Sequence, residues 1–145
     1  MARIEESVEI KRPADKVFAF TTDAKSWPKW QSTFPYAEQT SQGAVGVGTT
    51  FRGAIHMMGL TMKWTSTATE YEPYKKFGKN ITCGSIFNEQ HNTYESVEGG
   101  TKFTIVYNMK VGGLMKLFAP MIVSSTRKAL KQALSNLKGV LEAQT

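Results

Sequence analysis

The chain has 145 residues, of which 41% are hydrophobic and 21% are charged, and its formal net charge is +6. This length and composition are typical of one globular domain with a substantial core, so we predict a single domain over residues 1–145. No apolar run approaches the ~18 residues of a membrane-spanning helix, and the N-terminal residues lack the apolar core of a signal peptide. We therefore expect a cytoplasmic protein.

Cysteine and histidine are too scarce to indicate disulfide or metal chemistry. Cys83 is the only cysteine, which excludes an intrachain disulfide and a cluster of thiolate ligands. The two histidines, His56 and His91, are too few and too far apart for a convincing zinc site. We expect neither a metal nor a cofactor.

The positive charge is concentrated toward the C-terminus, where no acidic residue interrupts it. The basic residues of this stretch are Lys110, Lys116, Arg127, Lys128, Lys131 and Lys138. A solvated helix face is the simplest interpretation, and transient contact with an anionic membrane surface or an anionic ligand is the alternative. We expect no nucleic-acid partner, because no aromatic interleaving or groove-reading motif accompanies the charge. We expect a monomer or a weak dimer.

The predicted elements begin with one strand and two short helices. Apolar residues alternate along Ile4–Ile10, which predicts a half-buried strand. Pro13 suits the first position of a helix. Asp23 is a good N-cap for a second short helix, which Pro28 must limit or kink.

Strand patterns separated by short turns fill the middle of the chain. The predicted strands are Phe34–Thr40, Gly48–Met57, Leu60–Tyr71, Lys75–Cys83, Ile86–Ser96 and Thr101–Val111. Their short connections favour an antiparallel meander. Leucines at helical spacing then predict one long helix over about residues 114–142. Pro120, near its start, is expected to bend or break the first turns.

This order of elements resembles the helix-grip fold of the START-like (SRPBCC) superfamily, and within it the polyketide cyclase/dehydrase and lipid-transport branch. The segments that carry the resemblance are Pro13–Phe18, Asp23–Trp30, Gly46–Phe51 and Gly99–Phe103. The resemblance implies an α+β fold: an antiparallel seven-stranded sheet curved around a long C-terminal helix, with two short helices after strand 1. It also implies an apolar cavity between sheet and helix. It carries no fixed catalytic motif, since members include carriers, receptors and cyclases.

One end of the predicted meander is rich in soft apolar side chains, because alternate turns lie at the same end of a sheet. These side chains are Trp30, Phe34, Met57, Met58, Leu114, Met115, Phe118 and Met121. They would either form the mouth of a cavity, gated by the first turns of the final helix, or simply plug the end of the core.

Period-two alternation predicts which strand residues face the helix. The more apolar sets are Phe51, Gly53, Ile55 and Met57; Met62, Trp64, Ser66, Ala68 and Glu70; and Phe103, Ile105, Tyr107 and Met109. Small residues such as Gly53 are expected to leave room for a ligand. On Ile86–Ser96, the favoured register turns Asn88, Gln90, Asn92 and Tyr94 inward. An edge-facing or solvated row of amides is the alternative.

No ionisable residues form a catalytic constellation, so catalytic residues are not assigned. Glu6 and Glu70 occupy inward positions near strand ends, where a solvated charge is the simpler interpretation. Tyr107 is the inward polar group that we expect to donate a hydrogen bond to a ligand.

We predict that the protein binds an apolar small molecule, lipid-like or polycyclic, between the sheet and the final helix. The predicted ligand-binding residues are Trp30, Phe34, Phe51, Ile55, Met57, Trp64, Asn88, Gln90, Tyr107, Met109, Met115, Phe118 and Met121. The alternative is a polyketide cyclase/dehydrase-type enzyme that uses the same cavity. An ionisable side chain deep in the cavity would favour the enzyme. A filled interior and a flat methionine-rich end would favour a third class, a protein-interaction module.

Overall fold

A computed structural model describes residues 1–144 and contains one antiparallel sheet of seven strands. The strands are β1 (Ala2–Ile10), β2 (Ala37–Gln39), β3 (Thr50–Met57), β4 (Leu60–Glu72), β5 (Lys76–Cys83), β6 (Ile86–Val97) and β7 (Gly100–Val111). Their order across the sheet is β1-β7-β6-β5-β4-β3-β2. The predicted meander is therefore confirmed, and β1 is added at its far edge by pairing with β7.

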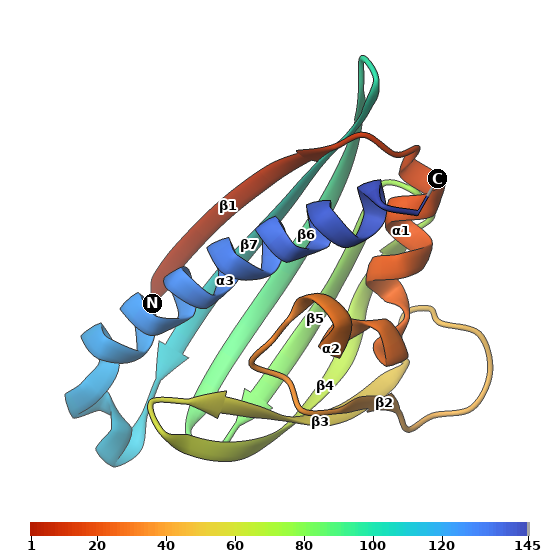
Figure 1. The fold of residues 1–145 in the computed structure, drawn as a ribbon. Helices are drawn as coiled ribbons and strands as arrows, with labels where there is room; N and C mark the ends of the chain where they lie inside the picture. Colours follow the sequence, from red (N-terminus) through yellow and green to blue (C-terminus); the bar gives the residue numbers. More distant parts are fainter. Residues whose placement is uncertain (145) are drawn as a thin grey trace.

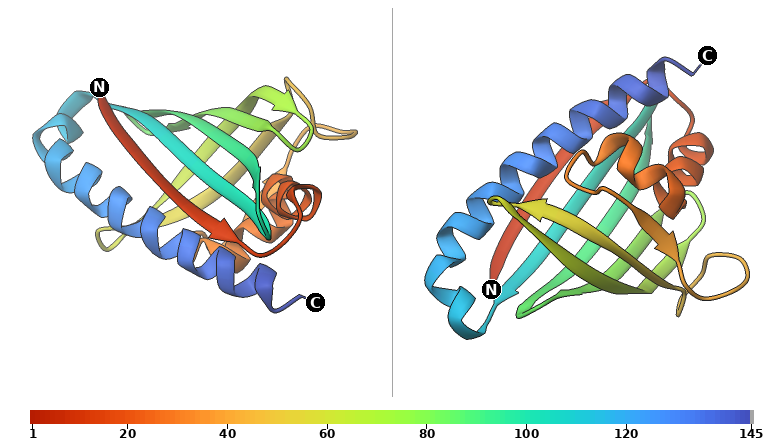
Figure 2. Two further views of the ribbon diagram at one scale, coloured as in Figure 1. Left: turned by 90° about the horizontal axis from the view of Figure 1, so that it is seen from above. Right: turned by 60° about the horizontal axis from the view of Figure 1, so that its bottom comes forward.

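The helices pack on one face of this curved sheet. They are α1 (Ala14–Thr22), the short 3₁₀ turn η1 (Ala24–Ser26), α2 (Trp27–Trp30), the 3₁₀ helix η2 (Gly113–Phe118) and α3 (Ala119–Glu142). The long helix α3 runs along the β1 side of this face, and α2 lies beside it (Figures 1 and 2). This is the predicted helix-grip arrangement.

Two predicted boundaries differ from the structure for reasons of backbone chemistry. The strand predicted at Phe34–Thr40 shortens to β2, because Pro35 has no N–H for a ladder hydrogen bond. The single predicted final helix divides into η2 and α3. Pro120 occupies the first turn of α3, where a backbone N–H has no partner within the helix in any case. The proline therefore begins the α-helix rather than bending it.

The C-terminal half of α3 is fastened to the end of β1. The Arg12 guanidinium donates to the carbonyl oxygen of Leu141 at 2.8 Å, and Lys138 Nζ donates to that of Glu9 at 2.7 Å. The Glu142 carboxylate accepts from the Lys11 backbone N–H at 2.9 Å and from Lys138. These hydrogen bonds lower the pKa of Glu142. This half of the helix covers solid core, whereas its N-terminal half lies over the cavity described below.

A bulge in β4 changes the face on which Glu70 lies. The pairing of β4 with β5 shifts register between Ala68 and Glu70, so the expected inward position of Glu70 is wrong. Its carboxylate instead covers Gly78, where an added Cβ would lie 2.6 Å from Oε1. It also lies 2.5 Å from Nδ1 of His91, which is outside the cavity lining.

None of the helices in residues 1–144 is both long and apolar enough to cross a membrane.

A cavity between the sheet and α3

The inner face of the sheet and the N-terminal half of α3 enclose a cavity of about 110 Å³. This volume is several times the ~10–15 Å³ that one water molecule needs. Strands β3 to β7 contribute the floor, and Ser125, Thr126, Ala129, Leu130 and Ala133 of α3 contribute the roof. All of these roof residues except Leu130 have small side chains. The helix can therefore lie close to the sheet without filling the space between them.

Most of the predicted ligand-binding residues line this cavity. Those that do are Phe34, Ile55, Met57, Trp64, Asn88, Gln90, Tyr107 and Met109. Contact with a ligand stays a prediction for each of them.

Trp30 and Phe51 lie in the solid core rather than in the cavity lining. Trp30 is 2% exposed, its ring centre lies 6.4 Å from that of Phe103, and Asn136 of α3 donates to its carbonyl oxygen. Phe51 packs against Trp27 with ring centres 4.9 Å apart. Trp30 therefore joins α2 to α3 and to the sheet, and its expected position at the mouth of the cavity is not supported.

Met115, Phe118 and Met121 also lie outside the lining. Met115 packs against the edge of the core, while Phe118 and Met121 are 50% and 58% exposed. Met121 precedes Leu130 by nine residues, which at 3.6 residues per turn places it on the opposite face of α3. Residues 113–118 form the 3₁₀ helix η2, with three residues per turn, and so do not belong to the α-helix predicted from about residue 114.

Gly53 does not leave the expected room for a ligand. It is paired across the ladder with Trp64, and the indole ring fills the place that a side chain at Gly53 would occupy. Trp64 also packs beside Phe34, with ring centres 5.4 Å apart. The cavity instead lies beyond Trp64, which forms one of its walls.

The amides of β6 point inward as the favoured register predicts. Asn88, Gln90 and Asn92 are buried, with exposed fractions of 9%, 6% and 2%. Gln90 Nε2 donates to Asn92 Oδ1 at 2.9 Å. Asn88 Oδ1 is buried without a hydrogen-bond partner among the described residues. One acceptor in the cavity lining is therefore available to a ligand.

The same region holds unused donors. Trp64 Nε1 and Ser66 Oγ are buried and likewise lack a hydrogen-bond partner within residues 1–144. Burial of the Tyr107 hydroxyl raises its pKa to about 12, so this phenol stays protonated at neutral pH and is able to donate. A buried polar group without a partner is costly, and a ligand that satisfies it gains affinity.

Lys79 lines the cavity but was not among the predicted ligand-binding residues. Its side chain lines the cavity and is 4% exposed. Nζ lies 3.7 Å from the ring centre of Trp27 and about 6 Å from the ring centres of Phe51, Trp64 and Phe77. No Asp or Glu lines the cavity among the described residues, and burial lowers the pKa of Lys79 to about 7.

A signal for Lys79 is present in the sequence. Phe77, Ile81 and Cys83 alternate as the apolar residues of β5, and Lys79 shares their phase. The general tendency of lysine to remain solvated hides this position from a reading based on residue type alone. At this position the alternation of side chains along β5 predicts burial better than the residue type does.

The comparisons with known proteins agree with this architecture. The sequence model of the family "Polyketide cyclase / dehydrase and lipid transport" matches residues 1–142, and the chain belongs to this family. A search of curated proteins found no match.

Solved structures with the same fold cover almost the whole chain at low sequence identity. TTHA0849 from Thermus thermophilus has a TM-score of 0.85 at 15% identity, over 99% of this chain and 100% of that one. The Zhui aromatase/cyclase from Streptomyces sp. R1128 has a TM-score of 0.85 at 14% identity, over 97% and 93%. A START superfamily protein from Mycobacterium smegmatis has a TM-score of 0.84 at 14% identity, over 99% of each chain. At these identities the likeness shows the fold alone.

Proposed function

We propose that the protein binds an apolar small molecule in the cavity beneath α3. The observation that carries this proposal is a cavity with mostly apolar walls and a few buried polar atoms, Trp64 Nε1 and Asn88 Oδ1 among them, that have no hydrogen-bond partner within residues 1–144. Apolar walls with few convergent polar groups are typical of small-molecule sites. Membership of a family described by cyclase and lipid-transport activities supports the same proposal.

Filling the cavity tests the proposal directly. Ala129 of α3 lines the cavity, so Ala129→Phe should abolish most binding of the apolar dye Nile red, measured by fluorescence titration. Ala19→Phe is the matched control, because Ala19 lies on the exposed side of α1. Equal dye affinity in both variants would contradict the proposal.

Native mass spectrometry of freshly purified protein, with organic extraction, would identify any molecule that copurifies.

A cyclase/dehydrase-type enzyme is the second candidate, and Lys79 favours it. An amine that is partly neutral near pH 7 can accept a proton from carbon next to a carbonyl group. In that case the protein should accelerate deuterium exchange of the α-protons of 2-decanone in D₂O, followed by NMR, and Lys79→Met should not. An exchange rate unchanged by the wild-type protein would count against catalysis of this kind.

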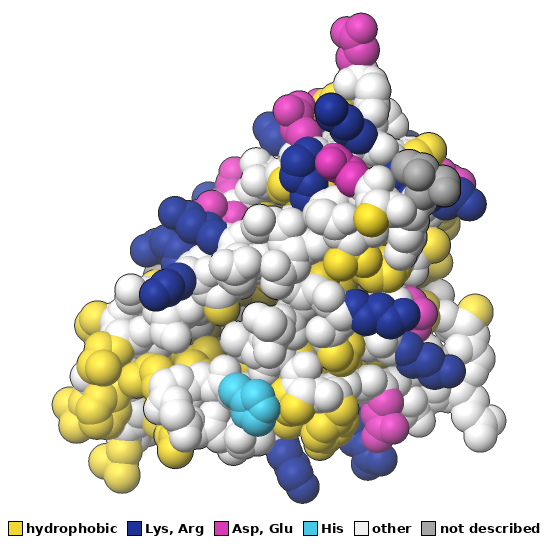
Figure 3. Space-filling view, viewed as in Figure 1, with side chains coloured by type: hydrophobic (Ala, Val, Ile, Leu, Met, Phe, Trp, Pro, Cys, Tyr) yellow, Lys and Arg dark blue, Asp and Glu magenta, His cyan; other side chains and the backbone are white. Residues whose placement is uncertain are grey.

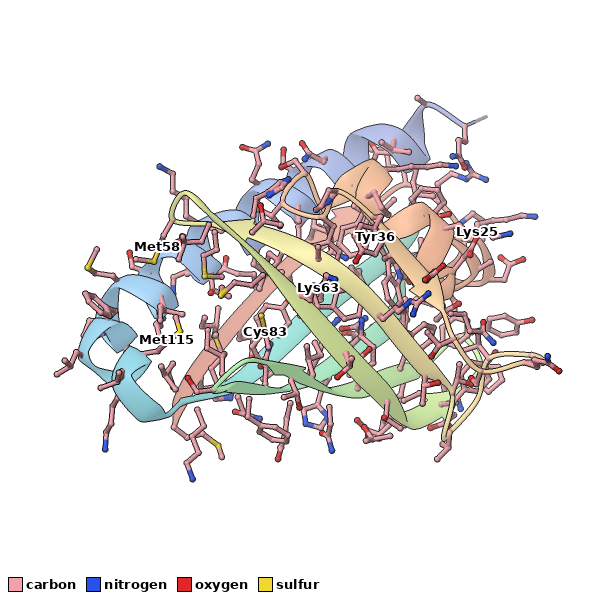
Figure 4. The ribbon with its side chains drawn as sticks, turned by 90° about the horizontal axis from the view of Figure 1, so that it is seen from below. Lys25, Tyr36, Met58, Lys63, Cys83 and Met115 are labelled. Atoms are coloured by element: carbon pink, nitrogen blue, oxygen red, sulfur yellow. The ribbon has the colours of Figure 1, made fainter. Side chains whose placement is uncertain are left out.

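We further propose that the protein takes up its ligand at an anionic bilayer, through the end of the molecule formed by η2. Leu114 and Leu117 are 86% and 82% exposed, and hydrophobic side chains gather at this end (Figure 3). Met58 on the β3–β4 turn and Met115 lie at the same end (Figure 4). Lys116 and Lys128 flank these residues, and no acidic residue occurs from residue 110 to 138. An apolar surface with a basic rim suits an anionic interface.

A further inference from the structure

Lys79 lies inside the proposed binding cavity, and no described residue supplies a counter-charge to it. No salt bridge of the described residues includes it, and no carboxylate contributes to the cavity lining over residues 1–144. Its neighbours are aromatic rings, of which Trp27 is the closest at 3.7 Å. Such rings attract an ammonium group but accept no full hydrogen bond and neutralise no charge.

A second donor in the same cavity is also unused. Trp64 Nε1 has no hydrogen-bond partner among the described residues, and the ring centre of Trp64 lies 5.9 Å from Lys79 Nζ. Two residues of the cavity lining, Trp64 on β4 and Lys79 on β5, therefore carry N–H donors that no described residue uses. A carboxylate has two acceptor oxygens and carries the missing negative charge.

We propose that the ligand is an apolar molecule with one carboxylate group, and that Lys79 supplies the counter-charge for this group while Trp64 Nε1 donates a second hydrogen bond to it. This inference rests on the proposed function, since it assigns the polar end of the ligand in the same cavity. The apolar remainder of the ligand lies along Met57, Met109 and Leu130, which line the cavity on three other elements.

The proposal couples binding to protonation of Lys79. The other titratable groups of the lining are Cys83, Tyr107 and His56. Burial raises the pKa of both Cys83 and Tyr107, so neither supplies a negative charge near pH 7. His56 is exposed and contacts Thr61, while α3 and α2 present no charged group to the lining. Above pH 7 the neutral amine must take up a proton for the ion pair to form.

Decanoic acid and 1-decanol provide a matched pair of probes, because they differ only at the polar end. We expect the acid to bind at least roughly tenfold more tightly than the alcohol at pH 6.5, as measured by tryptophan fluorescence titration. Lys79→Met should remove this preference, so that the acid and the alcohol bind with similar affinity. Lys63→Met is the control, because Lys63 is exposed on the outer side of β4 (Figure 4) and should keep the preference.

The wild-type protein alone provides a second test that does not depend on the folding of a variant. The acid is ionised throughout pH 6.5–9, so a fall in its preference over the alcohol across this range would report loss of the Lys79 proton. Equal affinities at pH 6.5, a preference that survives in Lys79→Met, or a preference independent of pH would each overturn this inference and leave the proposed function standing. Failure of both probes to bind would contradict the proposed function itself.

Discussion

The indole ring of Trp64 occupies the space above Gly53, so that a Cβ added at Gly53 would lie 2.5 Å from Cζ2 of the ring. The carbonyl oxygen of Tyr36 lies 2.6 Å from the same point. Because one of these neighbours is backbone, the site has little freedom to adjust. Glycine at this position therefore determines where one wall of the cavity stands.

Gly53→Ala should accordingly displace the Trp64 ring toward the cavity. We expect a loss of about 1–3 kcal/mol in the free energy of unfolding, as is usual for overpacking, together with weaker Nile red binding. Urea unfolding and dye titration measure the two effects. Gly46→Ala is the control, because an added Cβ there meets nothing within 4 Å; equal stability of the two variants would be the contradicting result.

The contact between Lys79 and Trp27 should be measurable as a coupling free energy. A double-mutant cycle with Lys79→Met and Trp27→Leu isolates it from the separate cost of each substitution. We expect a coupling of about 1–2 kcal/mol at pH 6, where the amine carries its proton, from a desolvated cation–π contact. The coupling should shrink at pH 9. Additive effects at pH 6 would show that the ring contributes only packing.

Lys79 should also make stability depend on pH. Burial lowers its pKa in the folded protein to about 7, whereas the unfolded chain has the ordinary lysine value of ~10.4. Between these values only the unfolded state binds the proton, so the free energy of unfolding should rise with pH, by about 1.4 kcal/mol per unit at most.

Urea unfolding at pH 7, 8 and 9 measures this slope as the difference between wild-type protein and Lys79→Met. Below pH 7 Lys79 is protonated in both the folded and the unfolded state, so the difference in the free energy of unfolding between wild-type protein and Lys79→Met should not change with pH. Lys63→Met, which alters an exposed lysine, should retain the wild-type slope. A wild-type slope identical to that of Lys79→Met would mean that the amine is protonated in both states throughout this range.

The exposed leucines of η2 should determine binding to anionic bilayers. Replacing Leu114 and Leu117 together by Ser should reduce cosedimentation with phosphatidylserine-containing vesicles, because the apolar contact is lost. Val47→Ser is the control, since Val47 is 69% exposed in a loop outside the η2 end. Vesicles of phosphatidylcholine alone should bind the wild-type protein less. Unchanged sedimentation of the leucine variant would refute the proposed docking surface.

Alternation and turn spacing were sufficient to predict strands β2 to β7 and their order, because short connections restrict an antiparallel sheet to very few arrangements; they did not place β1 beside β7. The alternation of residues also predicted correctly which side chains of β3 and β6 face the helix. Ile55, Asn88 and Gln90 are among them, and all three line the cavity. The rule failed at Glu70, where a bulge inserts one residue into β4. Bulges leave little trace in a single sequence, so this reversal was not predictable.

The predicted gate failed for a different reason. Met115, Phe118 and Met121 were grouped by hydrophobicity and by their position at one end of the predicted meander, in the first turns of the final helix. Hydrophobicity does not distinguish a side chain that closes a cavity from one that faces outward. Lys79 was missed because no inward phase was assigned to the predicted strand Lys75–Cys83, in which it alternates with the buried residues Phe77 and Cys83.

The pairing of β1 with β7 joins the two ends of the sequence, whereas every other strand pair joins consecutive strands. Local hairpins form quickly because little chain entropy is lost in closing them. The edge strand β1 instead pairs with a strand far along the chain, with Ala2 opposite Met109, and the roof helix α3 follows that strand in the sequence. We therefore expect the cavity to close after the hairpins have formed, and a ligand that binds in it would favour the completed state over the open sheet.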